Sequence, residues 1–199
     1  VRKMTDVCGF GLQSGTYVDF CCLELGKTIM VALEVTDIHG NSNTCMVEVT
    51  VDDKLKPTLT CPPNITLACS DYLDTSHLEI FGTVVTDPTK IKDVVVNNFY
   101  HHGFVGKDGL AKDNCSVTVT EKFKTDIHCH TGFVYRTFVA SDGKGLKDSC
   151  TQTITILNPD PFDEFDITWP SHYTGNGCRS DQTSPDVTGK PTFVNTYCG

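Results

Sequence analysis

The residues in this chain best suited to chemistry are its cysteines. There are eleven of them among 199 residues, well above the usage of an ordinary cytosolic protein. Their spacing repeats, because Cys22 follows Cys8 at the same interval at which Cys129 follows Cys115. Cysteines at repeating intervals indicate disulfides formed in an oxidising compartment, rather than thiols used as small buried apolar groups. We therefore expect few free thiols and an extracellular or cell-surface location.

Histidines and carboxylates are the other groups that could bind a metal ion. The histidines at His101-His102 and around Cys129 lack the ligand spacing of a zinc site, so we interpret them as exposed loop residues. Acidic residues accompany prolines at two separate places in the chain, and a calcium ion prefers such oxygen-rich surroundings. The candidate calcium ligands are Asp52, Asp53, Asp160 and Asp163. The alternative interpretation is a solvated acidic linker at each place.

Motifs of catalysis are missing from the sequence. It contains no Gly-x-Ser-x-Gly, no His-Glu-x-x-His and no phosphate-binding loop. Cys129 lies between two histidines, but a cysteine with a partner at a repeated interval is better explained by a disulfide. We therefore predict that the chain is not an enzyme. One group of aromatic residues, Phe99, Tyr100 and Phe104, favours an alternative function, the binding of a ligand such as a glycan.

Composition limits the class of protein and its partners. The formal net charge is −9, so the chain has no basic surface with which to bind nucleic acid. No apolar run approaches the length of a membrane-spanning helix. Threonine and valine are abundant while alanine and glutamate are scarce. This balance predicts an all-β protein, because β-branched side chains suit strands and disfavour helices.

The elements that must position the cysteines repeat along the chain with an offset of about 105 residues. Each copy has an apolar strand, an Asp-Gly turn, a strand opened by cysteine, and an acidic joint that contains proline. A repeat of this length matches one immunoglobulin-like sandwich. We therefore expect the second half of a module over 1–57, a complete module over 58–158 and the start of a third over 159–199.

Strands within these modules are predicted from alternation and from Gly, Pro, Asn and Asp punctuation. In the middle module they are expected at 59–62, 65–69, 79–86, 94–99, 116–123, 133–141 and 149–157. The stretch 86–112 is irregular and is predicted to be an inserted loop or an edge hairpin. The residues expected to face a core are Ile29, Val31, Leu33 and Val35 in the first module and Val134, Phe138 and Ala140 in the second.

Several stretches carry a likeness to a known family. They are 57–66, 113–115, 135–142 and 150–156, followed in the third module by Cys178, 184–191 and Cys198. In this order the stretches resemble the hyalin-repeat (HYR) family, and above all the HYR-like modules of giant Bacteroidota surface adhesins, some linked to gliding motility. The resemblance implies tandem immunoglobulin-like, fibronectin-III-like sandwiches stapled by disulfides, exported to the cell surface for adhesion or as a stalk. One departure is Trp169, at a position where the repeat would place a cysteine.

The resemblance also implies that Cys61 pairs with Cys150. We further expect short-loop bridges between Cys115 and Cys129 and between Cys8 and Cys22. Cys178 with Cys198 is a further expected pair. Cys21, Cys45 and Cys69 remain without an assigned partner.

The two incomplete modules predict the partners of this chain. Half a sandwich exposes its inner face and an unpaired sheet edge, and is not expected to be stable alone. Residues 1–57 and 159–199 should therefore be completed by neighbouring modules or by an identical subunit. In the second case, the third module of one subunit would donate strands to the first module of the next, with Cys198 beside Cys45. Repeated head-to-tail donation would build a filament.

Overall fold

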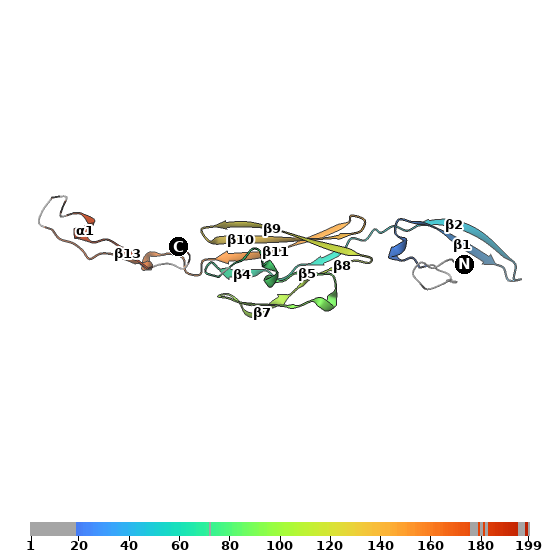
Figure 1. The fold of residues 1–199 in the computed structure, drawn as a ribbon, viewed down its shortest axis with the longest axis horizontal. Helices are drawn as coiled ribbons and strands as arrows, with labels where there is room; N and C mark the ends of the chain where they lie inside the picture. Colours follow the sequence, from blue (N-terminus) through green and yellow to red (C-terminus); the bar gives the residue numbers. More distant parts are fainter. Residues whose placement is uncertain are drawn as a thin grey trace.

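The computed structural model describes residues 19–71, 73–175, 179, 181, 183–194 and 198. Figure 1 shows an elongated arrangement, with a two-stranded hairpin at one end, a layered body in the middle and a thin arm at the other end. The described part is built mainly from strands joined by disulfides, which confirms the all-β class. Among the described residues, no helix is long and apolar enough to cross a membrane.

The N-terminal element is an antiparallel hairpin. A short 3-10 helix, η1 (Cys22–Glu24), precedes strands β1 (Thr28–Thr36) and β2 (Ser42–Thr50). Asp37 shapes the turn between the strands, since its carboxylate accepts hydrogen bonds from the backbone N–H groups of His39 and Asn41 at 2.8 Å. The turn is therefore held by hydrogen bonds among its own residues.

The middle body has a four-stranded sheet as one layer, in the order β4-β11-β10-β9. β4 runs parallel to β11, and the other neighbours are antiparallel. The strands are β4 (Ile65–Ala68), β9 (Val117–His128), β10 (Thr131–Asp142) and β11 (Lys147–Leu157). Their long alternating sequences, rich in Thr, Val and Ile, account for their length.

The facing layer is made of shorter elements. A three-stranded sheet has the order β3-β8-β5, and a separate hairpin pairs β6 with β7. These elements are β3 (Thr58–Thr60), η2 (Leu78–Phe81), β5 (Val84–Val85), η3 (Pro88–Lys90), β6 (Asp93–Asn97), β7 (His102–Lys107) and β8 (Gly109–Lys112). The core between the layers contains Ile65, Leu67, Leu78, Phe81, Val94, Val96, Val134, Ile154 and Ile156. The predicted core residues Val134, Phe138 and Ala140 are all buried.

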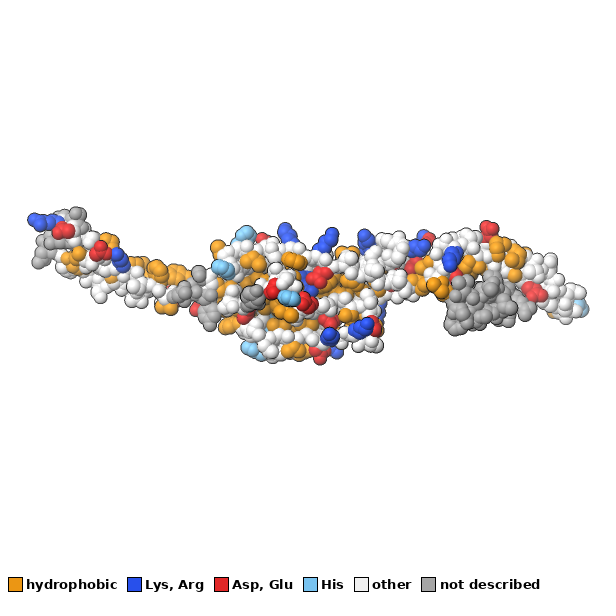
Figure 2. Space-filling model, viewed as in Figure 1, with side chains coloured by type: hydrophobic (Ala, Val, Ile, Leu, Met, Phe, Trp, Pro, Cys, Tyr) orange, Lys and Arg blue, Asp and Glu red, His pale blue; other side chains and the backbone are white. Residues whose placement is uncertain are grey.

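The C-terminal arm has little regular structure. It contains η4 (Glu164–Asp166), β12 (Ile167–Thr168), α1 (Pro185–Thr188) and β13 (Thr192–Phe193), and β12 pairs with β13. Large apolar side chains on the arm are exposed, and Figure 2 shows apolar surface along it. Those residues are Phe162, Phe165, Trp169, Tyr173, Val187, Phe193 and Val194.

Three strand predictions for the middle body need correction. Residues 79–86 form no single strand, because most of η2 and the two-residue β5 occupy that stretch. β9 continues past 123 to His128 because it pairs with β10 along its whole length. The irregular stretch contains the expected hairpin, β6–β7, and also β8, whose glycine at position 109 lies against β3 and leaves no room for a side chain.

The repeat is visible in the pairing of the strands. In the first hairpin Leu33 lies opposite Cys45. In the hairpin β10–β11 Phe138 lies opposite Cys150, and both residues are 105 positions later. The turns match as well, since Asp142 accepts hydrogen bonds from backbone N–H groups as Asp37 does. The two hairpins are therefore the same element in the same register, and we call β10–β11 the twin of β1–β2.

Candidate functional site: the junctions and the N-terminal hairpin face

The disulfide within the middle body joins Cys61 to Cys150, with 5.8 Å between their Cα atoms. Cys61 follows β3 and Cys150 lies on β11, so the bond links the two layers of the body. This is the pairing that the family resemblance implies. The cross-link closes a long loop, and loop-closure entropy stabilises such a fold by on the order of 4 kcal/mol.

The short-loop bridges predicted from spacing are wrong. Cys22 pairs with Cys115, and Cys69 pairs with Cys198. Cys115 and Cys129 cannot meet because β9 lies between them, and a fully extended strand of that length separates its ends by about 40 Å. Cys129 is instead a free thiol.

The remaining predicted pairs involve cysteines outside the described residues. Cys8 and Cys178 both lie there, but their predicted partners, Cys22 and Cys198, are bonded elsewhere. Cys21 is also disulfide-bonded. The other free thiol of the described part is Cys45, which is exposed.

The first junction joins the N-terminal hairpin to the middle body. Besides the Cys22–Cys115 disulfide, the Lys56 ammonium donates to the Asp148 carboxylate at 3.0 Å, which links the joint to β11. The hydrogen bond from Lys56 lowers the pKa of Asp148, because it stabilises the ionised carboxylate. Pro57 in the joint is fully buried. A disulfide, an ion pair and a buried ring thus fix one end segment against the body.

The acidic residues of this junction already have protein partners. Asp52 forms an ion pair with Lys54, whose hydrogen bond lowers the Asp52 pKa. Asp53 is buried, and its carboxylate accepts a hydrogen bond from the backbone N–H of Leu55 at 3.0 Å. Both carboxylates therefore shape the joint through contacts within the chain.

At the second junction, the Cys69–Cys198 disulfide ties the arm to the end of β4. The backbone N–H of Cys69 donates to the carbonyl of Leu157 at 2.8 Å, which holds this cysteine beside β11. Asp163 caps η4 by accepting from the backbone N–H of Phe165 at 2.7 Å, and Asp160 begins the arm. The arm that contains these two carboxylates lies at the opposite end of the body from the β1–β2 hairpin (Figure 1). In the described ranges, no three His, Cys, Asp or Glu residues gather as a metal site.

The aromatic residues predicted to bind a ligand lie on or near the β6–β7 hairpin. Phe99 and Tyr100 are in the turn, with ring centroids 5.0 Å apart in an edge-to-face arrangement. Phe104 lies on β7 opposite Val95, and both are exposed. The structure therefore brings two of the three rings into contact and places the third along the same hairpin.

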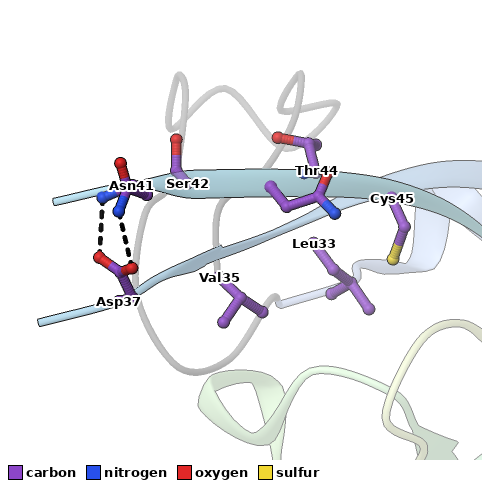
Figure 3. Close-up of a pocket in the computed structure, with 8 residues that line it drawn as sticks. Leu33, Val35, Asp37, Asn41, Ser42, Thr44 and Cys45 are labelled. Atoms are coloured by element: carbon purple, nitrogen blue, oxygen red, sulfur yellow. Dashed lines mark hydrogen bonds between the residues drawn. The ribbon is translucent and has the colours of Figure 1, made fainter. Parts of the chain in front are cut away.

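One face of the N-terminal hairpin is uncovered over part of its length. A hollow of about 470 Å³ is lined by Leu33, Val35, Cys45 and the residues of the turn. Figure 3 shows the side chains of Leu33, Val35 and Cys45 on one side of the hairpin. Of the four residues predicted to face a core here, Val31 is buried, but Val35 is 71% exposed. This segment thus has the pattern of a core face without a matching layer among the described residues.

Sequence reasoning missed one feature of the junctions and one feature of the middle body. Cys22 and Cys69 join different segments, and of the two only Cys69, which had no assigned partner, gave a signal of this. The second feature is a buried polar network, in which Arg136 donates to the side chain of Gln152 at 2.6 Å and to the carbonyl of Gly82 at 2.9 Å. Both residues stand at inward-facing positions that the predicted list of core residues did not include.

Comparison with known proteins assigns this chain to no family. No protein-family model matches this chain, and no curated protein is significantly similar to it.

Proposed function

We propose that this chain is a structural and adhesive segment of a long, repetitive extracellular or cell-surface protein. Its units are immunoglobulin-like sandwiches of the HYR-like kind, arranged in tandem as 1–57, 58–158 and 159–199. Its work is reach, stiffness and contact with other surfaces, as in adhesion or gliding motility, and it catalyses no reaction.

One observation carries this proposal. A disulfide ties each end segment to the middle body, Cys22–Cys115 at one junction and Cys69–Cys198 at the other. Bonds between segments, rather than within them, suit a rod under tension, because they limit how far the segments can be pulled apart. Such disulfides require an oxidising compartment, which supports a location outside the cell.

The proposed partners are neighbouring modules or identical subunits in a filament. Exposed apolar side chains on both the hairpin and the arm support this, since contiguous exposed apolar surface marks an interaction site. The version in which Cys198 of one subunit meets Cys45 of the next is wrong, because Cys198 is bonded to Cys69. Strand donation without that disulfide stays a prediction.

Small-angle X-ray scattering tests the rod directly. We expect the interatomic distances of the oxidised chain to have the distribution of a thin, elongated rod. A Cys22→Ser/Cys115→Ser variant should broaden it, because the N-terminal hairpin loses its covalent link. The matched control, Cys45→Ser/Cys129→Ser, removes two free thiols and should leave the profile unchanged. Identical profiles for all three proteins would contradict a rigid junction.

Glycan binding is the alternative function, and the contact between Phe99 and Tyr100 favours it. Aromatic faces stack on sugar rings when they are exposed, and both side chains are accessible. Binding to a glycan array that disappears in a Tyr100→Ala/Phe104→Ala variant would support this function. The absence of glycan binding by the wild-type chain on the array would contradict this alternative function.

Calcium at the acidic joints also stays a prediction. A ligand that binds only the folded protein must raise its melting temperature. Equal melting temperatures in calcium and in chelator would leave Asp52, Asp53, Asp160 and Asp163 with structural roles alone.

A further inference from the structure

We propose that the Cys45 face of the β1–β2 hairpin binds a partner strand containing a Cys-Pro sequence, and that Cys45 forms a disulfide with that cysteine by thiol–disulfide exchange. The Cys45 thiolate attacks a mixed disulfide between the partner cysteine and a small extracellular thiol, and the small thiol leaves. The partner is another repeat unit, outside this chain. The inference rests on the proposed function, an array of such units, and specifies the chemistry of one contact between them.

The twin hairpin within the same chain provides the template. Cys150 occupies in β10–β11 the position that Cys45 occupies in β1–β2. Cys150 is bonded to Cys61, which is followed by Pro62. The face around it is covered, since Phe138 is only 1% exposed. The β10–β11 hairpin therefore shows that this face, when covered, lies beside a strand with a Cys-Pro sequence.

The first hairpin presents the Cys45 end of the same face uncovered, although Val31 farther along that face is buried. Cys45 is a free, exposed thiol, and its cross-strand neighbour Leu33 is half-buried beside the hollow. The twin carries Arg136 and Gln152 on its face, and the corresponding residues here are Val31 and Val47. The face is thus more apolar than its twin, which favours an apolar strand over a charged ligand.

Residues 1–199 of a second copy do not supply such a strand with a free cysteine. Its one Cys-Pro sequence is Cys61-Pro62, and that cysteine is already bonded to Cys150. The arm carries Trp169-Pro170 at the corresponding place, and Cys198 is bonded to Cys69. A unit with a free Cys-Pro strand must therefore come from elsewhere in the array.

A peptide with the sequence of residues 57–68 tests the occupant directly. Its cysteine is activated as a mixed disulfide with thionitrobenzoate. The Cys45 thiolate attacks the peptide sulfur, a protein–peptide S–S bond forms, the peptide–thionitrobenzoate S–S bond breaks, and thionitrobenzoate leaves as a coloured thiolate. The exchange needs no added oxidant. The full chain is used as Cys129→Ser, which keeps Cys45, and as Cys45→Ser, which keeps Cys129.

Rates with the peptide are divided by rates with a small disulfide, cystamine, so that intrinsic thiol reactivity cancels. We expect the peptide to favour Cys45 over Cys129 by at least about tenfold, since binding to the face raises the local concentration of the peptide. Val35→Ser on the face should remove most of this preference. Met30→Ser, on the opposite face of β1, should preserve it.

Equal normalised rates at the two thiols would overturn the inference, as would a preference that survives Val35→Ser. A Cys45–Cys45 dimer on a non-reducing gel would also overturn it, by assigning the face to a second copy. The scattering profile of the rod does not depend on Cys45. If the peptide shows no preference for Cys45 while the scattering profile is that of a thin rod, the proposed function therefore still stands.

Discussion

Individual residues set the geometry of the first junction, and Lys56 is the clearest case. Its ammonium lowers the pKa of Asp148 below the ordinary value of 3.8. An aspartate whose pKa is lowered on folding adds stability above its unfolded pKa, and this stability is lost as the pH falls through the lowered folded value. We expect Lys56→Gln to raise the Asp148 pKa in a carboxyl NMR titration. Lys54→Gln is the control, and an equal effect of both variants on Asp148 would contradict the assignment.

The buried polar network at Gln152 is a second feature at this scale. Its amide donates to the carbonyls of Pro63 at 2.5 Å and Phe81 at 2.7 Å. We predict that Gln152→Val lowers the free energy of unfolding by about 3 kcal/mol, because buried polar groups then lack partners. Denaturant unfolding of the oxidised protein measures this, with the exposed Thr151→Val as control. A loss below that of the control would show that the network contributes nothing.

At the scale of elements, the turn between β9 and β10 carries strain. Cys129 and His130 both have positive φ, at 47° and 62°, the geometry of a two-residue hairpin turn that favours Asn-Gly. We expect Cys129→Asn/His130→Gly to raise the free energy of unfolding by about 1 kcal/mol. The control is the conformationally neutral Cys129→Ser. An unchanged or lower denaturation midpoint for the double variant would contradict this.

The sequence allowed the long hairpins to be predicted because alternation and Asp-Gly turns act locally. β10 and β11 lie within a few residues of their predicted ranges, and β1 and β2 are the apolar strand and the cysteine-bearing strand expected in the first module. The far end of β9 could not be predicted, since its residues 124–128 are exposed, all but Ile127 are polar, and they owe their strand conformation to pairing with β10. The disulfide partners Cys22 and Cys69 were missed for a related reason: spacing along a chain does not determine which segments meet in space.

For the whole molecule, the pattern of bonded and free cysteines is the first prediction. Thiol titration of the denatured, unreduced protein should find about three free thiols or fewer among the eleven cysteines. Cys45 and Cys129 should be labelled, and peptide mapping should recover Cys22 joined to Cys115 and Cys69 joined to Cys198. A recovered Cys115–Cys129 peptide, or a majority of reactive thiols, would contradict the junctions described above.

Pulling on the two chain ends in a single-molecule force experiment tests the central claim, a rod whose segments are covalently joined. Three disulfides join residues that lie far apart in the sequence, so most of the oxidised chain cannot be stretched between the two ends. They are Cys22–Cys115, Cys61–Cys150 and Cys69–Cys198. At up to about 3.6 Å per residue, the reduced chain should extend to roughly 700 Å and the oxidised chain to no more than about a third of that. An oxidised chain that extends as far as the reduced one would contradict the account.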